Sequence, residues 1–299
     1  MARRRPPTVH GLAVVDKPAG VTSHDVVGML RRRLGERRVG HAGTLDPDAT
    51  GLLLVGVGNA TRLLRFLTAL GKTYTAEVVL GVETTTLDAA GEVTAEHDMS
   101  AVTLDRARSA AAAHLTGPIL QVPPMVSAIR VDGRRLHELA REGIEVDRAP
   151  RPVTVHAFSV DATADPGVLA IEVTCSSGTY VRTLAADLGR LLGGGAHLRN
   201  LRRTRAGSFT VADAAPPDQA ELLPVAAAMR DYPAVHVDGA TAAFVANGRP
   251  LPRSAGFDAA GDGDGPWAVF HDDRLLAVYE PGEARTVKPA VVIPDSVAP

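Results

Sequence analysis

The sequence predicts a mixed α+β fold followed by a small β-rich region at its C-terminal end. Apolar stretches typical of strands alternate with helix-like stretches without a regular βαβ rhythm, which favours a mixed sheet over a doubly wound one. Near the C-terminus, "PWAVFHDDRLLAVYE" (266–280) has the pattern of two short strands joined at an Asp-Asp turn. The 299 residues are enough for one large domain and a small second one.

The first expected elements lie close to the N-terminus. The stretch "GLAVVDK" (11–17) predicts a short strand, and a Pro-Gly turn follows it. Thr22 or Ser23 then suits the start of a helix that ends at Gly35. The apolar run over 52–57 predicts a buried strand.

Later elements are predicted from their hydrophobic period. In chain order they are a strand over 73–81, a helix over 105–117, a helix over 136–143, a strand over 169–180 and a helix over 183–195. The stretch "LRNLRR" (198–203) has the pattern of an amphipathic helix. Residues 211–232 look like a connector with one helix.

Charge is unevenly distributed along a chain whose net charge is −2. Residues 1–210 hold 26 basic against 21 acidic residues, and residues 211–299 hold 6 against 13. Basic residues also gather at 31–38 and 198–205. Such runs are usually solvated helix faces, but they also suit contact with nucleic-acid phosphates.

Several classes of protein find no support in the sequence. The lone Cys175 excludes an internal disulfide and a thiolate zinc cluster. The stretch "LGKT" (70–73) has Phe66 where a phosphate loop needs glycine, and the ten histidines lack metal-binding spacing. No metal or nucleotide cofactor is therefore expected. The apolar stretches are too short to cross a membrane, and a cytoplasmic protein is expected.

Asp46 stands in an unusual setting, "RVGHAGTLDPDATGLLLVGVG" (38–58), at the entrance to a buried strand. An Asp-Pro pair is common turn chemistry, so Asp46 could simply shape the turn. A carboxylate near a core is costly unless a cation or several donors meet it. It could therefore also be held there for a reaction.

Seven stretches, in their order along the chain, resemble the bacterial tRNA pseudouridine-55 synthases, the TruB family. They are "VVDKPAGVTSHDVV", "RRVGHAGTLDPDATGLLLVGVGNATRL", "KTYTAEVVLG", "TTTLDAAGEV", "QVPPMVSAIRVDGRRLHELAREGIEV", "CSSGTYVRTLAADLG" and "GGGAHLRNLRRTRAGSF". The resemblance covers about 11–212 and, weakly, the tail.

The resemblance implies a pseudouridine-synthase fold, with a mixed, largely antiparallel sheet, flanking helices and a small PUA-like RNA-binding domain. The expected boundaries are 1–212 for the catalytic domain, 213–232 for a connector and 233–299 for the PUA-like domain. It also implies isomerisation of uridine 55 in the T arm of tRNA after base flipping, without metal or nucleotide cofactor. A monomer that contacts no membrane is expected.

The family's site residues fall on matching positions of this chain. Asp46 would be the nucleophile, attacking either the uracil ring or the ribose carbon. Tyr74 would stack on the flipped base, with a strand aromatic in the core as the alternative. Tyr180 would contact the ring or move a proton, and Arg182 would hold Asp46, unless it lies on a solvent face. Leu201 would close the uracil pocket.

Other assignments are less specific. His41 and Thr44 would lie beside the RNA, with His41 filling space left by the flipped base unless it is an ordinary loop histidine. Lys17 would be structural or would contact the RNA backbone. Arg202 and Arg203 are candidates for contact with phosphates.

Two other functions stay open from the sequence. A non-catalytic RNA-binding or RNA-folding protein could keep this fold, although it would be expected to lose Asp46, Tyr74 or Arg182. A glycosidase or base-excising glycosylase begins with the same attack on a sugar carbon, but most glycosidases need a second carboxylate. Within pseudouridine synthases, another uridine or another RNA is a further alternative.

Overall fold

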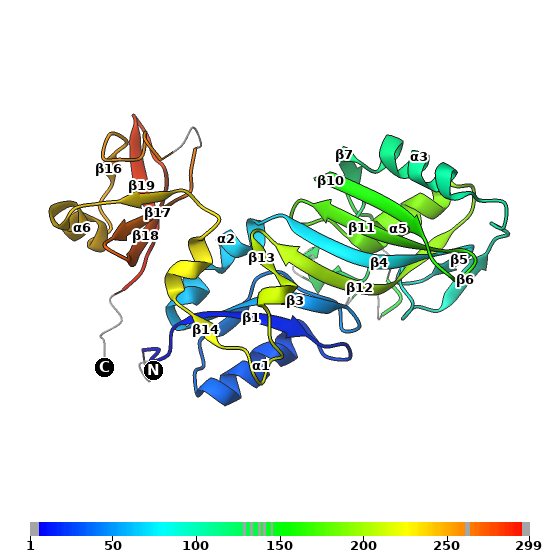
Figure 1. The fold of residues 1–299 in the computed structure, drawn as a ribbon, viewed down its shortest axis with the longest axis horizontal. Coiled ribbons are helices and arrows are strands. Elements are labelled where there is room, and N and C mark those ends of the chain that lie inside the picture. The colour runs from blue at the N-terminus through cyan, green and yellow to red at the C-terminus, as the bar shows by residue number, and fades with distance from the viewer. Residues whose placement is uncertain are drawn as a thin grey trace.

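The computed structural model describes residues 6–127, 130–131, 134–136, 139, 142–144, 146–260 and 264–294. The chain forms a ten-stranded sheet and, near its C-terminus, a separate five-stranded sheet (Figure 1). Within the described ranges, no helix is long and apolar enough to span a membrane.

The ten-stranded sheet is mixed and largely antiparallel. Its central strands pair in the order β14 (Leu222–Leu223), β1 (Gly11–Lys17), β3 (Thr50–Val57), β12 (Ala196–Ala206), β4 (Lys72–Leu80), β11 (Val168–Cys175), β10 (Arg151–Ala162) and β7 (Gly117–Gln121). Two short strands join this sheet, β2 (Val39–His41) beside β3 and β13 (Phe209–Thr210) beside β12. Among its strand pairs in the described residues, only β12 and β3 run parallel. The expected sheet type is confirmed.

Helices and short hairpins complete the large domain. The α-helices of this region are α1 (Ser23–Leu34), α2 (Leu64–Ala69), α3 (Leu104–His114) and α5 (Val181–Leu191), and the 3₁₀ helices are η1 (Gly58–Leu63), η2 (Val211–Asp213) and η3 (Val225–Met229). Two hairpins pair β5 (Val82–Thr84) with β6 (Val93–Glu96) and β8 (Arg130–Val131) with β9 (Arg134–Arg135). Helices α3 and α5 pack in one apolar cluster with β4, β10 and β11, whereas α1 packs against β1 and β3.

Helix α1 begins and ends where its sequence predicts. The Thr22 side chain accepts a hydrogen bond from the Asp25 backbone N–H at 3.0 Å, and Asp25 accepts one in return from the Thr22 backbone N–H at 2.8 Å. This reciprocal pair satisfies donors that the first helical turn leaves free. At the other end, Gly35 adopts φ 63°, a left-handed conformation that glycine accepts readily.

The C-terminal region forms its own small core. Its strands pair in the order β15 (Ala234–His236), β17 (Trp267–His271), β18 (Arg274–Pro281), β19 (Thr286–Val292) and β16 (Leu251–Pro252), and its helix is α6 (Gly239–Ala246). Trp267 and Tyr279 are fully buried between them. The predicted pair of strands about the Asp-Asp turn is confirmed as β17 and β18.

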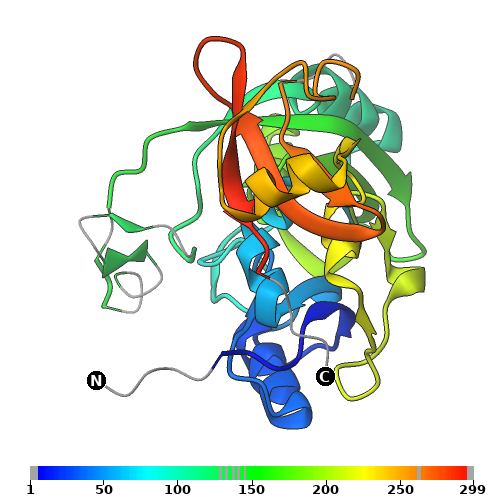
Figure 2. The same cartoon turned by 90° about the vertical axis from the view of Figure 1, so that its left-hand side faces the viewer.

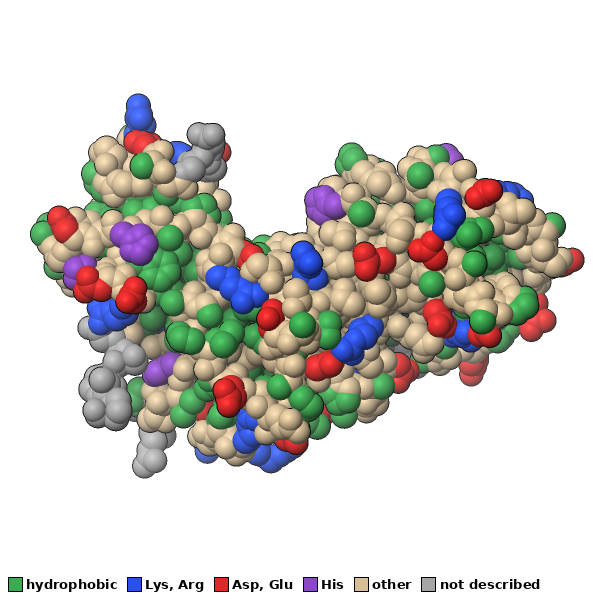
Figure 3. Space-filling view, in the orientation of Figure 1, with side chains coloured by type: hydrophobic (Ala, Val, Ile, Leu, Met, Phe, Trp, Pro, Cys, Tyr) green, Lys and Arg blue, Asp and Glu red, His purple; other side chains and the backbone are tan. Residues whose placement is uncertain are grey.

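The two sheets are joined by a shared apolar cluster. Ala268, Leu275 and Val278 of the small sheet pack with Leu12 and Phe66 of the large domain. Viewed from the small sheet, the segment that carries β8 and β9 extends to one side of the body (Figure 2). The molecule is hollowed between its two lobes, and basic side chains lie in that hollow (Figure 3).

Three predicted helices differ from the structure or lie partly outside the residues that it describes. The predicted amphipathic helix over 198–203 is wrong, because these residues lie in β12, between β3 and β4. The connector over 211–232 holds η2, η3 and β14 in place of one helix. Half of the predicted helix over 136–143 lies outside the described residues.

Candidate active site around Asp46

The loop that carries Asp46 is fastened by a buried lysine. Lys17 is 0% exposed, and its ammonium donates hydrogen bonds to the carbonyl oxygens of Pro18 at 2.9 Å, Val21 at 2.7 Å and Pro47 at 2.9 Å. These contacts tie the end of β1 to the residue that follows Asp46. Burial lowers the pKa of Lys17, while nearby carboxylates, including that of Asp46, oppose this shift. These contacts fit the structural alternative for Lys17, and its contact with the RNA backbone stays a prediction.

A serine fixes the same loop from the start of α1. The Ser23 hydroxyl donates to the carbonyl oxygen of Leu45 at 3.1 Å, and the Leu45 backbone N–H donates to that hydroxyl at 2.8 Å. The Gly20 N–H also donates to the Pro47 carbonyl at 3.0 Å. The position of the Asp46 carboxylate is thus set by backbone contacts on both sides of it.

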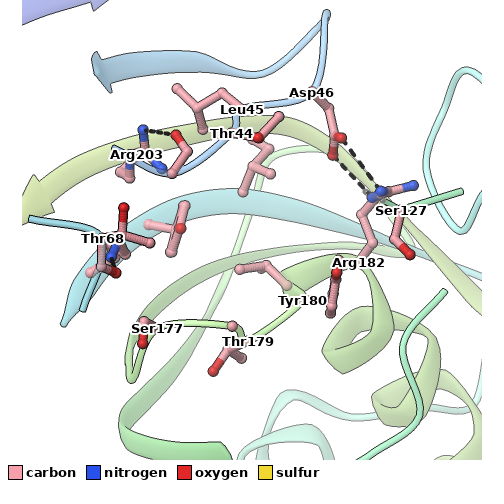
Figure 4. A pocket seen from close by; sticks show the side chains of 16 residues that line it. Thr44, Leu45, Asp46, Thr68, Ser127, Ser177, Thr179, Tyr180, Arg182 and Arg203 are labelled. Carbon is pink, nitrogen blue, oxygen red and sulfur yellow. Dashed lines mark hydrogen bonds and ion pairs between the residues drawn. The ribbon is translucent and has the colours of Figure 1, made fainter. Parts of the chain in front are cut away.

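The predicted contact between Asp46 and Arg182 is present. The Arg182 Nε lies 3.1 Å from Asp46 Oδ2, and its NH2 group donates to Oδ1 at 3.4 Å (Figure 4). The Arg182 side chain is 5% exposed and that of Asp46 is 41% exposed. Arg182 therefore does not lie on a solvent face, and it presents two nitrogens to one carboxylate.

Arg182 also holds a second carboxylate that the sequence reasoning did not single out. Its NH1 group lies 3.2 Å from Asp88 Oδ2 and donates to the Thr86 carbonyl oxygen at 2.8 Å. Its NH2 group donates to the carbonyl oxygen of Val126 at 2.9 Å. Asp88 lies in "TTTLDAAGEV", which is one of the seven stretches that resemble the family. The sequence therefore contained a sign that Asp88 could belong to the site.

The charges around Asp46 act in opposite directions on its pKa. Loss of hydration in the site raises the pKa of Asp46 above its usual value, and the Arg182 guanidinium lowers it. The carboxylate of Asp88 adds to the upward shift. The buried Arg182 guanidinium thus pairs with both Asp46 and Asp88, and the three side chains together carry a net negative charge.

A cavity of about 400 Å³ opens beside Asp46. Tyr74 of β4 and Leu201 of β12 lie on its wall, and so does Tyr180, which immediately precedes α5. Burial raises the pKa of the Tyr74 phenol, and the nearby Arg203 opposes the shift. Tyr74 is half-buried and lines this cavity, so it is not a fully enclosed core aromatic.

Tyr180 is positioned through its backbone by another residue that the sequence reasoning missed. The Tyr180 N–H donates to Gln121 Oε1 at 2.8 Å, and Gln121 Nε2 donates to the Tyr180 carbonyl oxygen at 3.1 Å. Gln121 is 2% exposed and ends the edge strand β7. This paired contact fixes the start of α5, and with it the position of Arg182.

The two motif-loop candidates lie in different places. Thr44 lines the cavity and is exposed. His41 is half-buried on β2 and is not among the cavity-lining residues. Burial lowers the pKa of His41, which favours the neutral imidazole.

The two adjacent arginines also differ in position. Arg202 places both terminal nitrogens on Asp16, at 3.0 and 2.7 Å, and its side chain is 35% exposed. Arg203 is 1% exposed and lines the cavity, where its Nε donates to the Leu52 carbonyl oxygen at 2.6 Å. The register of β12 against β4 turns the Arg203 side chain inward, so the expected contact of Arg203 with RNA phosphates stays a prediction that the buried position does not favour.

The described residues contain no group of three or more His, Cys, Asp or Glu side chains arranged to hold a metal ion. Cys175 is buried, and burial raises the pKa of its thiol to about 11.

Known proteins match the chain over most of its length. Residues 31–181 match the "TruB family pseudouridylate synthase (N terminal domain)", and residues 182–229 match the "tRNA pseudouridylate synthase B C-terminal domain". The tRNA pseudouridine synthase B of Arthrobacter sp. (strain FB24) is 45% identical over 298 residues, covering 96% of this chain and 97% of that protein. That of Rhodococcus jostii (strain RHA1) is 52% identical over 251 residues, covering 81% and 82%.

Solved structures agree on the fold. The archaeal box H/ACA sRNP Nop10-Cbf5 complex contains a chain with a TM-score of 0.70 and 23% identity, covering 97% of this chain and 88% of that one. An H/ACA RNP bound to a substrate RNA containing 2'-deoxyuridine contains a chain with a TM-score of 0.69 and 23% identity, covering 96% and 86%. With the sequence matches, these findings show that the chain belongs to the TruB family of pseudouridine synthases.

Proposed function

We propose that this protein isomerises uridine 55 in the T arm of tRNA to pseudouridine, with Asp46 as the nucleophile. The main support for this proposal is that Arg182 holds Asp46 at the edge of a cavity whose wall includes Tyr74 and Leu201. The curated relatives are named tRNA pseudouridine synthase B, which supports tRNA as the substrate. A tRNA substrate also supports a cytoplasmic location, and the protein is proposed to act as a monomer.

The cavity suits a nucleobase that has left its stack. Its volume of about 400 Å³ lies in the usual range for small-ligand pockets. Flipping a base out of folded RNA costs about a few kcal/mol, and stacking on an aromatic face returns about 1–3 kcal/mol. Tyr74 would provide that face, Leu201 would close the pocket over the base, and Tyr180 would contact the ring.

The Asp46 carboxylate has the position that a nucleophile needs. Its loop is fixed by Lys17 and Ser23, and the Arg182 fork orients its two oxygens. An attack on the ribose carbon or on the uracil ring is compatible with this arrangement. The detached base is rejoined in the same site, so a single carboxylate serves without a metal or nucleotide cofactor.

The domain assignment is part of the proposal. Residues 1–212 would form the catalytic domain, 213–232 the connector, and 233–299 a small PUA-like domain that contributes to RNA binding. The basic hollow between the two lobes supports a role of both lobes in RNA contact (Figure 3). Thr44, at the cavity mouth, and the partly exposed Arg202 are candidates for contacts with the RNA, as is His41 in the neighbouring strand.

The test is to incubate purified protein with an unmodified tRNA transcript, without additives and with EDTA, and to map pseudouridine. Conversion of uridine 55 alone is expected, and Asp46→Asn should bind the transcript without converting it. Release of free uracil would indicate a glycosylase instead. Binding of tRNA with no modified base would support the non-catalytic alternative.

A further inference from the structure

Two buried cations lie together in the cavity, next to Tyr74. Lys72 is 6% exposed and Arg203 is 1% exposed, and both line the cavity. Lys72 precedes Tyr74 by two residues on β4, and Arg203 is the β12 partner of Tyr74. Residues with these relations project from the same face of a sheet. The sequence alone does not single out Lys72.

Both cations are held by neutral groups. The Lys72 ammonium donates to the carbonyl oxygens of Thr68 and Leu70, each at 2.6 Å, at the end of α2. Arg203 donates to the carbonyl oxygens of Leu52 at 2.6 Å and Gly43 at 3.2 Å. Among the residues that the structure describes, no carboxylate forms an ion pair with either cation.

Such an arrangement is unusual for a protein interior. Buried charges are normally paired, because each loses several kcal/mol of hydration. The C-terminal end of α2 offsets part of this cost for Lys72. An ammonium has three donors, however, and the two carbonyls use only two of them. A donor and two positive charges thus remain available beside Tyr74.

The opposite side of the cavity carries the opposite charge. There Asp46 and Asp88 share the single guanidinium of Arg182. In the close view, Asp46 and Arg182 lie on one side and Arg203 with Thr68, whose carbonyl binds Lys72, on the other (Figure 4). A base that enters the cavity would therefore have the nucleophile on one side and the two cations on the other.

We propose that Lys72 and Arg203 form an anion-binding end of the cavity, which holds a negatively charged oxygen of the uracil ring during the reaction. This inference rests on the proposed function. Cations that are already in place where charge develops in a water-poor site are an effective form of catalysis, because they need no reorganisation.

Both routes open to Asp46 create this negative charge. If Asp46 attacks the ribose carbon C1′, an Asp46 oxygen bonds to C1′, the C1′–N1 bond breaks, and its electron pair leaves with the base as uracilate. If Asp46 attacks ring carbon C6, an Asp46 oxygen bonds to C6 and the C5–C6 electron pair moves to the O4 carbonyl as an enolate. In each case the carbonyl oxygens of the ring take up charge. In the first route, C5 then attacks C1′ and the bond between C1′ and Asp46 breaks, which returns its electron pair to the carboxylate. In the second route, the C1′–N1 bond breaks and C1′ bonds to C5, and loss of the C5 proton then expels Asp46 from C6 with its electron pair. In both routes the ring loses the proton on C5 and gains one on N1, so the product is an isomer of the substrate.

The charge state of Lys72 gives the proposal a second readout. Burial and the neighbouring Arg203 lower the pKa of Lys72 to about 8. The other titratable groups that face it are the Cys175 thiol, whose pKa of about 11 keeps it neutral there, and the phenol of Tyr74, whose pKa is raised. Lys72 is thus the group in this cluster that loses its charge just above neutral pH.

The experiment compares Lys72→Met with Arg190→Met, which changes an exposed arginine of α5 that pairs with Asp187. Pseudouridine formation is measured in single turnovers at saturating enzyme, together with the Kd for the unmodified transcript. Removing one donor to a developing oxyanion commonly costs about 10²–10³-fold, so Lys72→Met should slow the saturated rate by at least about tenfold. Its Kd should stay within about twofold, and Arg190→Met should resemble the wild type.

Two results would overturn the proposal. An unchanged saturated rate, with a lower Tm, would mean that Lys72 only caps α2. A weaker Kd with a smaller salt dependence and an unchanged saturated rate would mean that it binds an RNA phosphate. Wild-type conversion is the reference, so its absence would contradict the proposed function and not this inference.

The pH profile of the wild type tests the proposal without a variant, so it still applies if Lys72→Met does not fold. At limiting enzyme, the second-order rate constant reports groups of the free enzyme. It should fall as the pH rises above about 8, the value to which the pKa of Lys72 is lowered. Lys72→Arg should remove this fall, because a guanidinium stays charged. A wild-type rate constant that is flat from about pH 7 to about pH 10, across the pKa of Lys72, would contradict the proposal.

Discussion

Arg182 is a single cation shared by two carboxylates and two backbone carbonyls. Its three nitrogens each have an assigned partner, and the planar fork keeps those partners at fixed angles. A lysine ammonium is a point charge on a flexible stem and cannot reach all of them together. Of the two long basic side chains, only arginine can therefore make all of these contacts at position 182.

We expect Arg182→Lys to slow pseudouridine formation by at least about tenfold, because the ammonium cannot orient both Asp46 oxygens. The matched control is Arg190→Lys, which changes an exposed arginine of the same helix that pairs with Asp187. Single-turnover rates for the two variants give the comparison. A rate for Arg182→Lys near that of the wild type would show that charge alone is needed.

Coupling between the two partners can be measured in a double-mutant cycle on the rate with Asp46→Asn and Arg182→Met. Residues that act as a unit give strongly non-additive losses, so the double variant should be little slower than the slower single variant. Additive losses would mean that Arg182 contributes independently of Asp46.

If Asp46 is the nucleophile, as proposed, its ionisation sets the acid side of the pH profile. A nucleophilic carboxylate must be ionised, so activity should fall as the pH drops through the pKa of Asp46, which is raised above the usual carboxyl value. Asp88 contributes to that upward shift. Asp88→Asn should therefore move the acid limb to lower pH, whereas Asp161→Asn, at an exposed aspartate, should leave it in place. A limb that moves to higher pH in Asp88→Asn would contradict this assignment.

The raised pKa of Asp46 also makes the stability of the folded chain depend on pH. Because the pKa of Asp46 is raised on folding, the folded chain binds this proton more tightly than the unfolded chain. The contribution of Asp46 to the free energy of unfolding therefore becomes more favourable as the pH falls through the folded pKa toward the unfolded value. Asp46→Asn should remove this contribution and raise stability at neutral pH.

At the scale of elements, the position of the loop that carries Asp46 depends on Lys17, which joins this loop to β1. We expect Lys17→Met to lower the free energy of unfolding by at least about 1–3 kcal/mol, because three carbonyl groups lose a buried donor. Lys288→Met, at an exposed lysine of β19, is the control, and urea unfolding is the measurement. A loss of activity without any loss of stability would instead indicate a direct contact of Lys17 with RNA.

Elements with a clear local pattern could be predicted, including the strands β1 and β3 and the pair β17 and β18, whereas β12 could not. The limits of α1 follow from Thr22, Asp25 and Gly35, which act within the helix itself. In contrast, β12 carries four arginines within 199–205, a composition that locally resembles a solvated helix. Its conformation is imposed by β3 and β4 on either side.

In the candidate site, too, some contacts could be predicted from the sequence and others could not. The contact between Asp46 and Arg182 was predicted, because both residues lie in stretches that resemble the family. The inward side chain of Arg203 was not, since only the register of β12 against β4 gives its direction. Asp88 and Gln121 were missed because each acts through a partner that is distant in sequence, Arg182 and Tyr180 respectively.

At the scale of the whole molecule, the two sheets share buried apolar surface and specific polar contacts. Arg65 of α2 lies 2.7 Å from Glu280 of β18, and the Tyr232 hydroxyl donates to the Phe66 carbonyl oxygen at 2.8 Å. The exposed ion pair contributes little, so the apolar cluster supplies most of the attachment. The small sheet is therefore expected to hold a fixed position relative to the cavity.

Adjacent leucines of β18 allow this attachment to be tested. Leu275 packs in the cluster shared with the large domain, whereas Leu276 points the other way, into the core of the small sheet, and both are buried. Leu→Ala in a core costs about 2–5 kcal/mol. If the chain unfolds as one unit, Leu275→Ala and Leu276→Ala should each shift a single calorimetric transition to lower temperature. If Leu276→Ala instead produces a separate early transition and leaves pseudouridine formation unchanged below it, the small sheet unfolds independently and its fixed position is not needed for the reaction.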